Sequence, residues 1–284
     1  MKLNRLRDLA QRHPLGTFVT LAYAISWTLW VPALFGAGGM ALLALGAFGP
    51  PIAAGLVVHW NGGSVQEWLR PLVRWRVPGR YWLYALGVPA ALFAAMNLEL
   101  ALLGENVELG RLTSALPSYL ATFVVIALIG GGQEEPGWRG FVLDRLQGRY
   151  SPFLATLVLG VIWGVWHLPI YGLGFVGPMM FVFYYTWLWN RTGSLLLCVV
   201  LHGSFTAALD NLILMRDSLT VDLAILGTLV GGAALLVAAT RGRLGFDRHV
   251  TAALAAARSA PVGADAGQPV EPNAPGGEGA ALRV

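Results

Sequence analysis

Charge is scarce in this chain of 284 residues. Asp, Glu, Lys and Arg together make up 12% of it, whereas 56% of the residues are hydrophobic and the mean hydropathy is +0.62. Soluble domains carry roughly 25% charged residues, which cover the surface that faces water. The scarcity of charge therefore excludes a water-soluble domain and predicts an integral membrane protein.

Cysteine is almost absent, since Cys198 is the only one. A single thiol excludes an internal disulfide framework and any metal site built from several cysteines. The net charge of +4 at pH 7 does not indicate a nucleic-acid partner. In a membrane protein the positions of Lys and Arg report the topology instead.

Long apolar runs are what the chain has in abundance. A helix of about 20 apolar residues crosses a bilayer, so these runs predict an all-α, polytopic membrane helix bundle of about eight transmembrane helices. The Gly49-Pro50-Pro51 step predicts a kink in the second helix. The predicted spans are 17–35, 40–60, 81–103, 119–147, 151–172, 174–190, 193–215 and 221–239.

Composition divides the chain into three regions. Residues 1–16 form a basic N-terminal segment, residues 17–240 form the transmembrane domain, and residues 241–284, rich in Ala, Pro and Gly, form a tail that we expect to be disordered. With the N-terminus in the cytoplasm, all but Arg111 and Arg216 of the 19 basic residues fall on the cytoplasmic side. This bias predicts a protein of the cell membrane with both termini in the cytoplasm.

The fourth predicted span contains the polar stretch GGQEEPGWRGF. A helix continued to about Gln147 crosses the membrane with two glutamates in its middle, and Pro136 is predicted to kink it. Glu135 and Arg139 are four residues apart, so they share a helix face and can neutralise each other. Glu134 lies on a different face and remains the carboxylate available for chemistry.

Polar residues of three predicted spans share one depth in the membrane. With a helix rise of about 1.5 Å per residue, Glu134 lies roughly 20 Å and His167 about 22 Å from the cytoplasmic side. By the same rise, His202 lies about 16 Å and Thr206 about 22 Å from that side. Ionisable groups are costly in lipid unless they face one another or a wet cavity. We therefore expect Glu134, His167 and His202 to converge around a cavity open to the cytoplasm, with a purely structural polar cluster as the alternative.

Three short motifs of this region resemble those of a known family. The stretch EEPGWRG resembles the Glu-Glu-x-x-x-Arg motif of the CAAX-protease and bacteriocin-processing (CPBP) family of intramembrane proteases, also called the CAAX prenyl protease 2 or abortive-infection type. WGVWHLP resembles the family's Phe-x-x-x-His motif, here Trp163 to His167. TGSLLLCVVLHGSFTA resembles its His-x-x-x-Asn motif, here His202 to Thr206. The resemblance covers a motif core of residues 119–211, with Trp in place of Phe and Thr in place of Asn.

The resemblance implies an intramembrane, glutamate-dependent peptidase of the kind often labelled a metalloprotease. Glu134, assisted by His167, would activate a water molecule by general-base catalysis. His202 and Thr206 would stabilise the oxyanion. The residues that the resemblance implies as supporting the site are Glu135, Arg139 and Trp163.

The use of a metal is left open by the resemblance. One Glu with two His is also a plausible zinc set, which here would be Glu134, His167 and His202. We expect water activation by the protein's own groups, with zinc as an optional cofactor. The implied substrate is a peptide or a membrane-associated protein in the bilayer, and the sequence specifies neither its identity nor the cleavage site.

Other classes of protein lack their motifs in this chain, which has no His-Glu-x-x-His zinc motif and no Gly-x-Ser-Gly nucleophile site. Cys198, one turn before His202, is expected to be a small buried hydrophobe rather than a nucleophile. A transporter is disfavoured because no inverted repeat of broken helices is visible. The remaining alternative is a non-catalytic membrane protein, acting in immunity or partner binding on the same fold.

Overall fold

The computed structural model describes residues 2–215 and 218–247, and the regular structure of this part of the chain is helical, with no strand. Among the described residues, six helical segments are long and apolar enough to cross a membrane, and two shorter apolar helices, Pro152–Trp166 and Leu195–Asn211, accompany them. These segments follow the predicted spans in order. The prediction of an all-α polytopic membrane bundle is confirmed.

The segments differ in how continuous their helices are. Within the described residues the α-helices are α1 Lys2–Arg12, α2 Pro14–Leu34, α3 Gly39–Gly46, α4 Gly49–Trp60, α5 Val65–Leu69, α6 Gly79–Leu102, α7 Arg111–Val125, α8 Glu135–Gly137, α9 Asp144–Gln147, α10 Pro152–Trp166, α11 Leu168–Tyr171, α12 Val176–Thr192, α13 Leu195–Asn211 and α14 Leu219–Ala239. Turns of 3₁₀-helix lie at Arg70–Val73, Gly132–Glu134 and Gly172–Phe175, and π-helical turns at Ile126–Gly130 and Trp138–Leu143.

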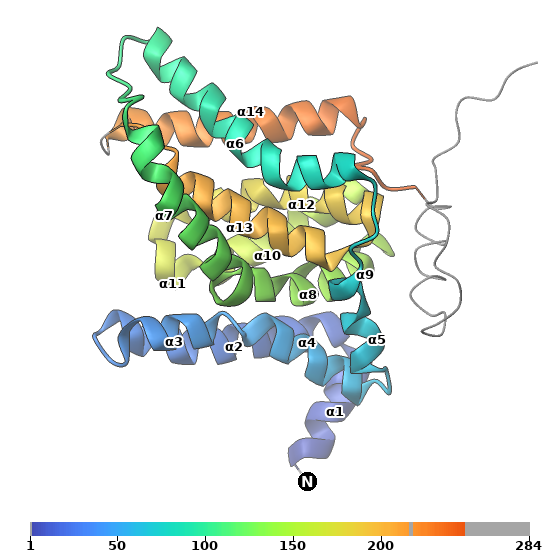
Figure 1. Cartoon of the computed structure of the whole chain (residues 1–284). Coiled ribbons are helices and arrows are strands. Elements are labelled where there is room, and N and C mark those ends of the chain that lie inside the picture. The colour runs from blue at the N-terminus through green and yellow to red at the C-terminus, as the bar shows by residue number, and fades with distance from the viewer. Residues whose placement is uncertain (1, 216–217, 248–284) are drawn as a thin grey trace, which may run out of the picture.

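The helices form layers that run alongside one another (Figure 1). α2 and the interrupted pair α3–α4 make one layer, α8 to α13 lie against it, and α6 and α14 cover the opposite side. The predicted kink in the second span is present, because α3 ends at Gly46 and α4 begins at Gly49. The hydroxyl of Ser26 in α2 donates a hydrogen bond of 2.7 Å to the carbonyl of Gly46, which ties this break to its neighbour.

Basic residues gather at one end of the bundle. The α4–α6 connection, the α9–α10 turn, the α12–α13 turn and the end of α14 all lie at that end (Figure 1). Arg111, at the start of α7, lies at the other end, and Arg216 is outside the described residues. The structure therefore shows the charge asymmetry, while its assignment to the cytoplasm stays a prediction.

The first residues of the predicted tail are described by the structure, and the domain boundary at residue 240 stays a prediction. Residues 240–247 form an ordered turn that folds back against α12, because the amide of Asn190 donates to the carbonyl of Leu244 over 2.9 Å. The backbone N–H of Leu244 in turn donates to the hydroxyl of Thr240 over 3.2 Å, and Leu244 is fully buried. The rest of the predicted tail, 248–284, lies outside the described residues.

Candidate active site

The segment 111–147 is broken in its middle. α7 passes into the π-helical turn Ile126–Gly130, Gly131 leaves the helix with φ 170° and ψ −38°, and a 3₁₀ turn leads into α8. The prediction of one continuous helix kinked at Pro136 is therefore wrong. Pro136 lies in the first turn of α8, where its missing N–H costs no helical hydrogen bond, and the break lies five residues earlier.

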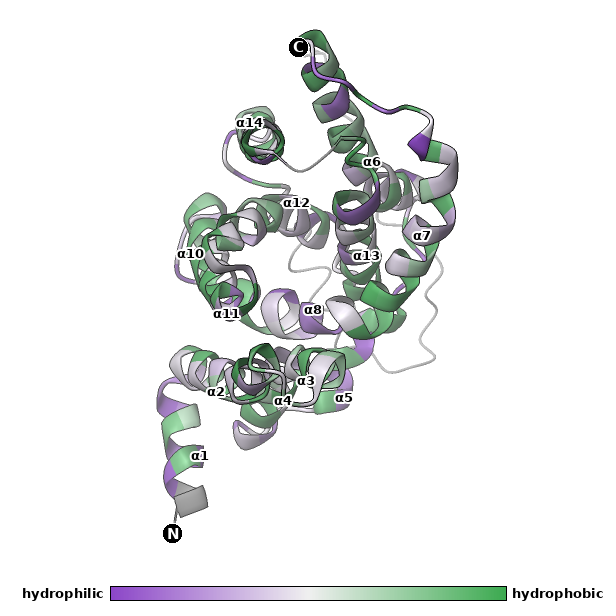
Figure 2. Ribbon diagram, turned by 90° about the vertical axis from the view of Figure 1, so that its left-hand side faces the viewer, coloured by the Kyte–Doolittle hydropathy of each residue, from purple (hydrophilic) through white to green (hydrophobic). Residues whose placement is uncertain are grey.

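Two glycines allow this broken segment to approach other helices closely. A Cβ on Gly131 would collide with Nε2 of His202, so α13 and the break can meet only without a side chain there. A Cβ on Gly137 would lie 2.8 Å from Cβ of Pro50, which explains how α8 packs on α4. The hydrophilic α8 is thereby enclosed among hydrophobic helices (Figure 2).

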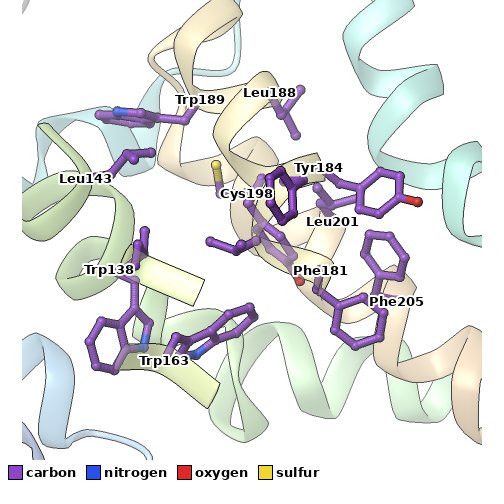
Figure 3. Packing of buried hydrophobic residues seen from close by; sticks show 14 of the residues in the cluster. Trp138, Leu143, Trp163, Phe181, Tyr184, Leu188, Trp189, Cys198, Leu201 and Phe205 are labelled. Carbon is purple, nitrogen blue, oxygen red and sulfur yellow. The ribbon is translucent and has the colours of Figure 1, made fainter. Parts of the chain in front are cut away.

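Glu134 is only 2% exposed, and two indole rings hold its carboxylate. Its Oε2 accepts a hydrogen bond of 2.9 Å from Nε1 of Trp163 in α10 and one of 3.2 Å from Nε1 of Trp138. The two rings lie close together in Figure 3. No described residue donates to Oε1 of Glu134, so this oxygen is left for another partner.

Glu135 has two cationic or potentially cationic partners on one oxygen. Its Oε1 lies 3.1 Å from Nη1 of Arg139 and 2.7 Å from Nδ1 of His202. The predicted pair of Glu135 and Arg139 is present, and the contact with His202 joins α8 to α13. Arg139 is also stacked between rings, with its guanidinium carbon 4.2 Å from the ring centroid of Trp163 and 4.0 Å from that of Tyr185.

His167 follows the last residue of α10 and is 5% exposed. Its Nδ1 lies 2.9 Å from the carbonyl of Trp163, so Nδ1 carries the proton and Nε2 is free to accept one. The imidazole rings of His167 and His202 lie 5.4 Å and 5.8 Å from the indole ring of Trp163. No hydrogen bond joins His167 to Glu134 among the residues described, so Trp163 is the link between them.

Several buried polar atoms of this cluster have no partner. In the described part of the chain, these atoms are Oε2 of Glu135, Nε and Nη2 of Arg139 and the hydroxyl of Tyr185. Thr206 lies one turn beyond His202, is half-buried, and makes no side-chain hydrogen bond to a described residue. Buried polar groups in folded proteins are nearly always bonded, so these atoms indicate room for water or for a substrate.

Two residues that contact the buried charges of this cluster, Trp138 and Tyr185, were not identified from the sequence. Trp138 lies four residues after Glu134, which is the helical spacing at which side chains meet, so this signal was available. Tyr185 had no signal, because it is 46 residues from Arg139 and contacts it only through the packing of α12. Trp163, predicted as a supporting residue, contacts both Glu134 and Arg139.

In the described part of the chain, Cys198 and Asn211 of α13 make no hydrogen bond to this cluster. Cys198 is fully buried among hydrophobic side chains, as expected for a small hydrophobe (Figure 3). Asn211 donates to the hydroxyl of Thr122 over 3.3 Å and to the carbonyl of Ala207 over 2.9 Å. Its amide therefore ties α13 to α7 and is unavailable to take the place of Thr206.

The described residues do not form a metal site as they are placed. No group of three or more His, Cys, Asp or Glu side chains gathers in 2–215 and 218–247 so as to hold a metal ion. Nδ1 of His202 and Oε2 of Glu134 are already engaged in protein contacts. The optional zinc on Glu134, His167 and His202 stays a prediction.

Comparisons with known proteins match the same segment. Residues 114–208 match the family model of the type II CAAX prenyl endopeptidase Rce1-like proteins. A CAAX prenyl protease 2 of Methanococcus maripaludis is 30% identical over 121 residues, which cover 36% of this chain. The match spans 44% of that relative's length, so the similarity concerns the motif-bearing part of both proteins.

Proposed function

We propose, from the match of residues 114–208 to the Rce1-like CAAX prenyl endopeptidases, that the protein is an intramembrane endopeptidase of the CPBP family. In this proposal Glu134 and His167 activate water, and His202 with Thr206 stabilises the oxyanion. The observation that carries it is the buried carboxylate of Glu134, which is held by two indole N–H groups, one of them from Trp163, whose ring also lies against both imidazole rings.

Water activation needs a carboxylate with one oxygen held and one oxygen open. The two indole donors fix Oε2 of Glu134, so Oε1 is the oxygen that accepts the proton of a water molecule. The resulting hydroxide attacks the scissile carbonyl carbon, and the proton passes from Glu134 to the leaving amine. His167 can hold the same water through Nε2, because its Nδ1 is occupied by the carbonyl of Trp163.

To stabilise the oxyanion, His202 needs a second N–H donor in addition to Nδ1, which faces Glu135. Nδ1 of His202 is engaged by Glu135, so a hydrogen bond to the oxyanion comes from Nε2–H of the protonated ring. Thr206, on the same face of α13, supplies a second donor through its hydroxyl.

The substrate in this proposal is a peptide bond of a membrane-associated protein or peptide. The name of the relative, CAAX prenyl protease 2, suggests testing a C-terminal peptide with a prenylated cysteine beside the same peptide without the lipid. Cleavage of both would place recognition in the peptide, and cleavage of the lipidated peptide alone would place it in the lipid.

The test is Glu134→Gln in purified protein, assayed with both peptides in one detergent. The amide keeps the shape of the side chain but cannot accept a proton, so turnover is expected to fall by roughly 10²- to 10⁴-fold. Cys198→Ala is the matched control and is expected to retain turnover, because the thiol has no part in the chemistry. Normal cleavage by Glu134→Gln, or unaltered biological activity of Glu134→Ala, would instead favour a non-catalytic protein on this fold.

A further inference from the structure

A second site lies at the basic end of the bundle, away from Glu134. A cavity of about 390 Å³ opens there between the start of α6 and the ends of α12 and α14, three helices that lie against one another. Its volume is in the range of small-ligand sites. The side chains that matter for its chemistry are Arg80, Tyr81, Trp187, Arg191, Arg243 and Phe246.

The cavity has an excess of positive charge. Three guanidiniums line it, from Arg80, Arg191 and Arg243, against the single carboxylate of Asp247. None of the three forms an ion pair with a described residue. Nε of Arg191 contacts the hydroxyl of Tyr81 over 3.4 Å, and the guanidinium carbon of Arg80 lies 5.1 Å from the same ring. The arginines are thus positioned by an aromatic side chain rather than neutralised.

The turn after α14 lines one side of this cavity. Arg241 and Leu244 have φ values of 51° and 46°, in the left-handed region that non-glycine residues rarely occupy. Burial of Leu244 and its hydrogen bonds to Asn190 and Thr240 hold this backbone in place. Such conformations persist where the surrounding structure imposes them, often at ligand sites. Here the turn carries Arg243 and Phe246 to the cavity.

We propose that this cavity binds a phosphate group, carried either by an anionic lipid headgroup or by a free phosphate. Arginine pairs with phosphate oxygens through two parallel N–H donors, and three arginines around one cavity suit a tetrahedral anion. The N-terminus of α6, which no side chain caps, adds backbone N–H groups and the positive end of a long helix dipole. Basic pockets between membrane helices, lined by aromatic rings, are also where lipid headgroups bind.

A role in topology alone explains these arginines less well. Basic residues that only mark a membrane side, or that complement the end of a helix, are expected to extend into water or contact carbonyls. Arg80 and Arg243 are exposed to solvent, as that role expects, but the half-buried Arg191 contacts Tyr81. Arg80 in addition lies in the first turn of α6, where the helix dipole disfavours a cation. An anion in the cavity accounts for both placements.

The test measures thermal stability of the purified full chain in a neutral detergent. Three additives are compared: phosphatidylglycerol, zwitterionic phosphatidylcholine and inorganic phosphate. The variant is Arg80→Gln with Arg243→Gln, which keeps most of the side-chain length. The control is Arg76→Gln with Arg149→Gln, two exposed arginines at the same end of the bundle that do not line the cavity.

Phosphatidylglycerol is expected to raise the melting temperature of the wild-type protein and the control more than phosphatidylcholine does. In the cavity variant its apparent affinity should fall by about tenfold or more, because two charged hydrogen-bond donors are lost. A matching effect of inorganic phosphate identifies free phosphate as the ligand, and an effect of the lipid alone identifies a headgroup. Equal losses in both variants, or no anion effect in the wild type, would overturn the proposal, and the melting temperatures without additive show whether each variant is folded. The proposed peptidase activity does not enter this test.

Discussion

Asn97 in α6 and the Glu135–Arg139 pair in the broken segment are both buried polar groups, and they differ in how fully they are hydrogen-bonded. Nδ2 of Asn97 donates to the carbonyls of Phe93 and Leu212 over 2.7 Å and 2.6 Å, and Oδ1 accepts the backbone N–H of Leu214 over 3.1 Å. In the pair, Oε2 of Glu135 and Nε and Nη2 of Arg139 have no partner among the described residues.

This difference separates a structural polar group from a functional one. A buried group with all its bonds made fixes the chain around it, as Asn97 does for the segment that follows α13. A buried polar group with unsatisfied donors or acceptors destabilises the fold unless water or a ligand forms the missing hydrogen bonds. The contrast predicts that changes at Asn97 alter stability, and that changes in the Glu135 region alter both stability and activity.

The largest effect is expected from separating Glu135 and Arg139. Glu135→Gln leaves the buried charge of Arg139 without its carboxylate, which is expected to destabilise the protein by about 3–5 kcal/mol. Arg139→Met should destabilise it less, because Glu135 keeps its contact with His202. The double variant removes both charges. Its loss in free energy of unfolding should therefore be smaller than the sum of the losses in the two single variants. Reversible unfolding in mixed detergent, followed by tryptophan fluorescence, measures all three. Strictly additive losses would mean that the two side chains are not coupled.

A smaller effect, on turnover, is expected from a change at Thr206. Like the Glu135–Arg139 pair, this residue has polar atoms without a hydrogen-bond partner among the described residues. Thr206→Val keeps the shape and removes the hydroxyl, and loss of one oxyanion donor lowers turnover by about 100-fold or more. Thr206→Asn, which recreates the usual family residue, should restore or raise the rate. Turnover of one peptide by the three proteins in the same detergent is the measurement. A wild-type rate in Thr206→Val would make Thr206 a packing residue.

The smallest effect is expected at Asn97. Asn97→Leu leaves the N–H of Leu214 and the carbonyl of Leu212 unpaired and should cost about 1–3 kcal/mol in stability. Turnover of the folded protein should be unchanged, because no atom of the active site is touched. Glu99→Gln, at an exposed position of the same helix, serves as the control and should change stability by less than about 0.5 kcal/mol. A fall in turnover without a fall in stability would contradict the structural role of Asn97.

The proline and glycine positions show that local helix propensity does not fix where a helix breaks in this protein. Pro89 lies inside α6 and leaves it a continuous helix, although proline is the strongest helix breaker by propensity. The segment 111–147 breaks at Gly131 rather than at Pro136. Local propensity indicated that a break was possible near the glutamates. Its position was set by the close approach of His202, which a Cβ at 131 would prevent.

The sequence by itself determined the class of the protein and the course of its helices. A span must be apolar for a fixed length in order to cross the bilayer, so each span is visible in its own residues. The pair of Glu135 and Arg139 was predictable for the same reason, since contacts four residues apart depend on helix geometry alone.

Only the tertiary structure decided which partners the two glutamates have. Trp163 is 29 residues from Glu134, and His202 is 67 residues from Glu135. The helix rise predicts the depth of such residues in the membrane, but their rotation about the helix axis depends on packing with other helices. For that reason the shared depth could be read from the sequence, whereas the indole donors on Glu134, the contact of Glu135 with His202 and the stacking of Arg139 on Tyr185 were decided by the folded bundle.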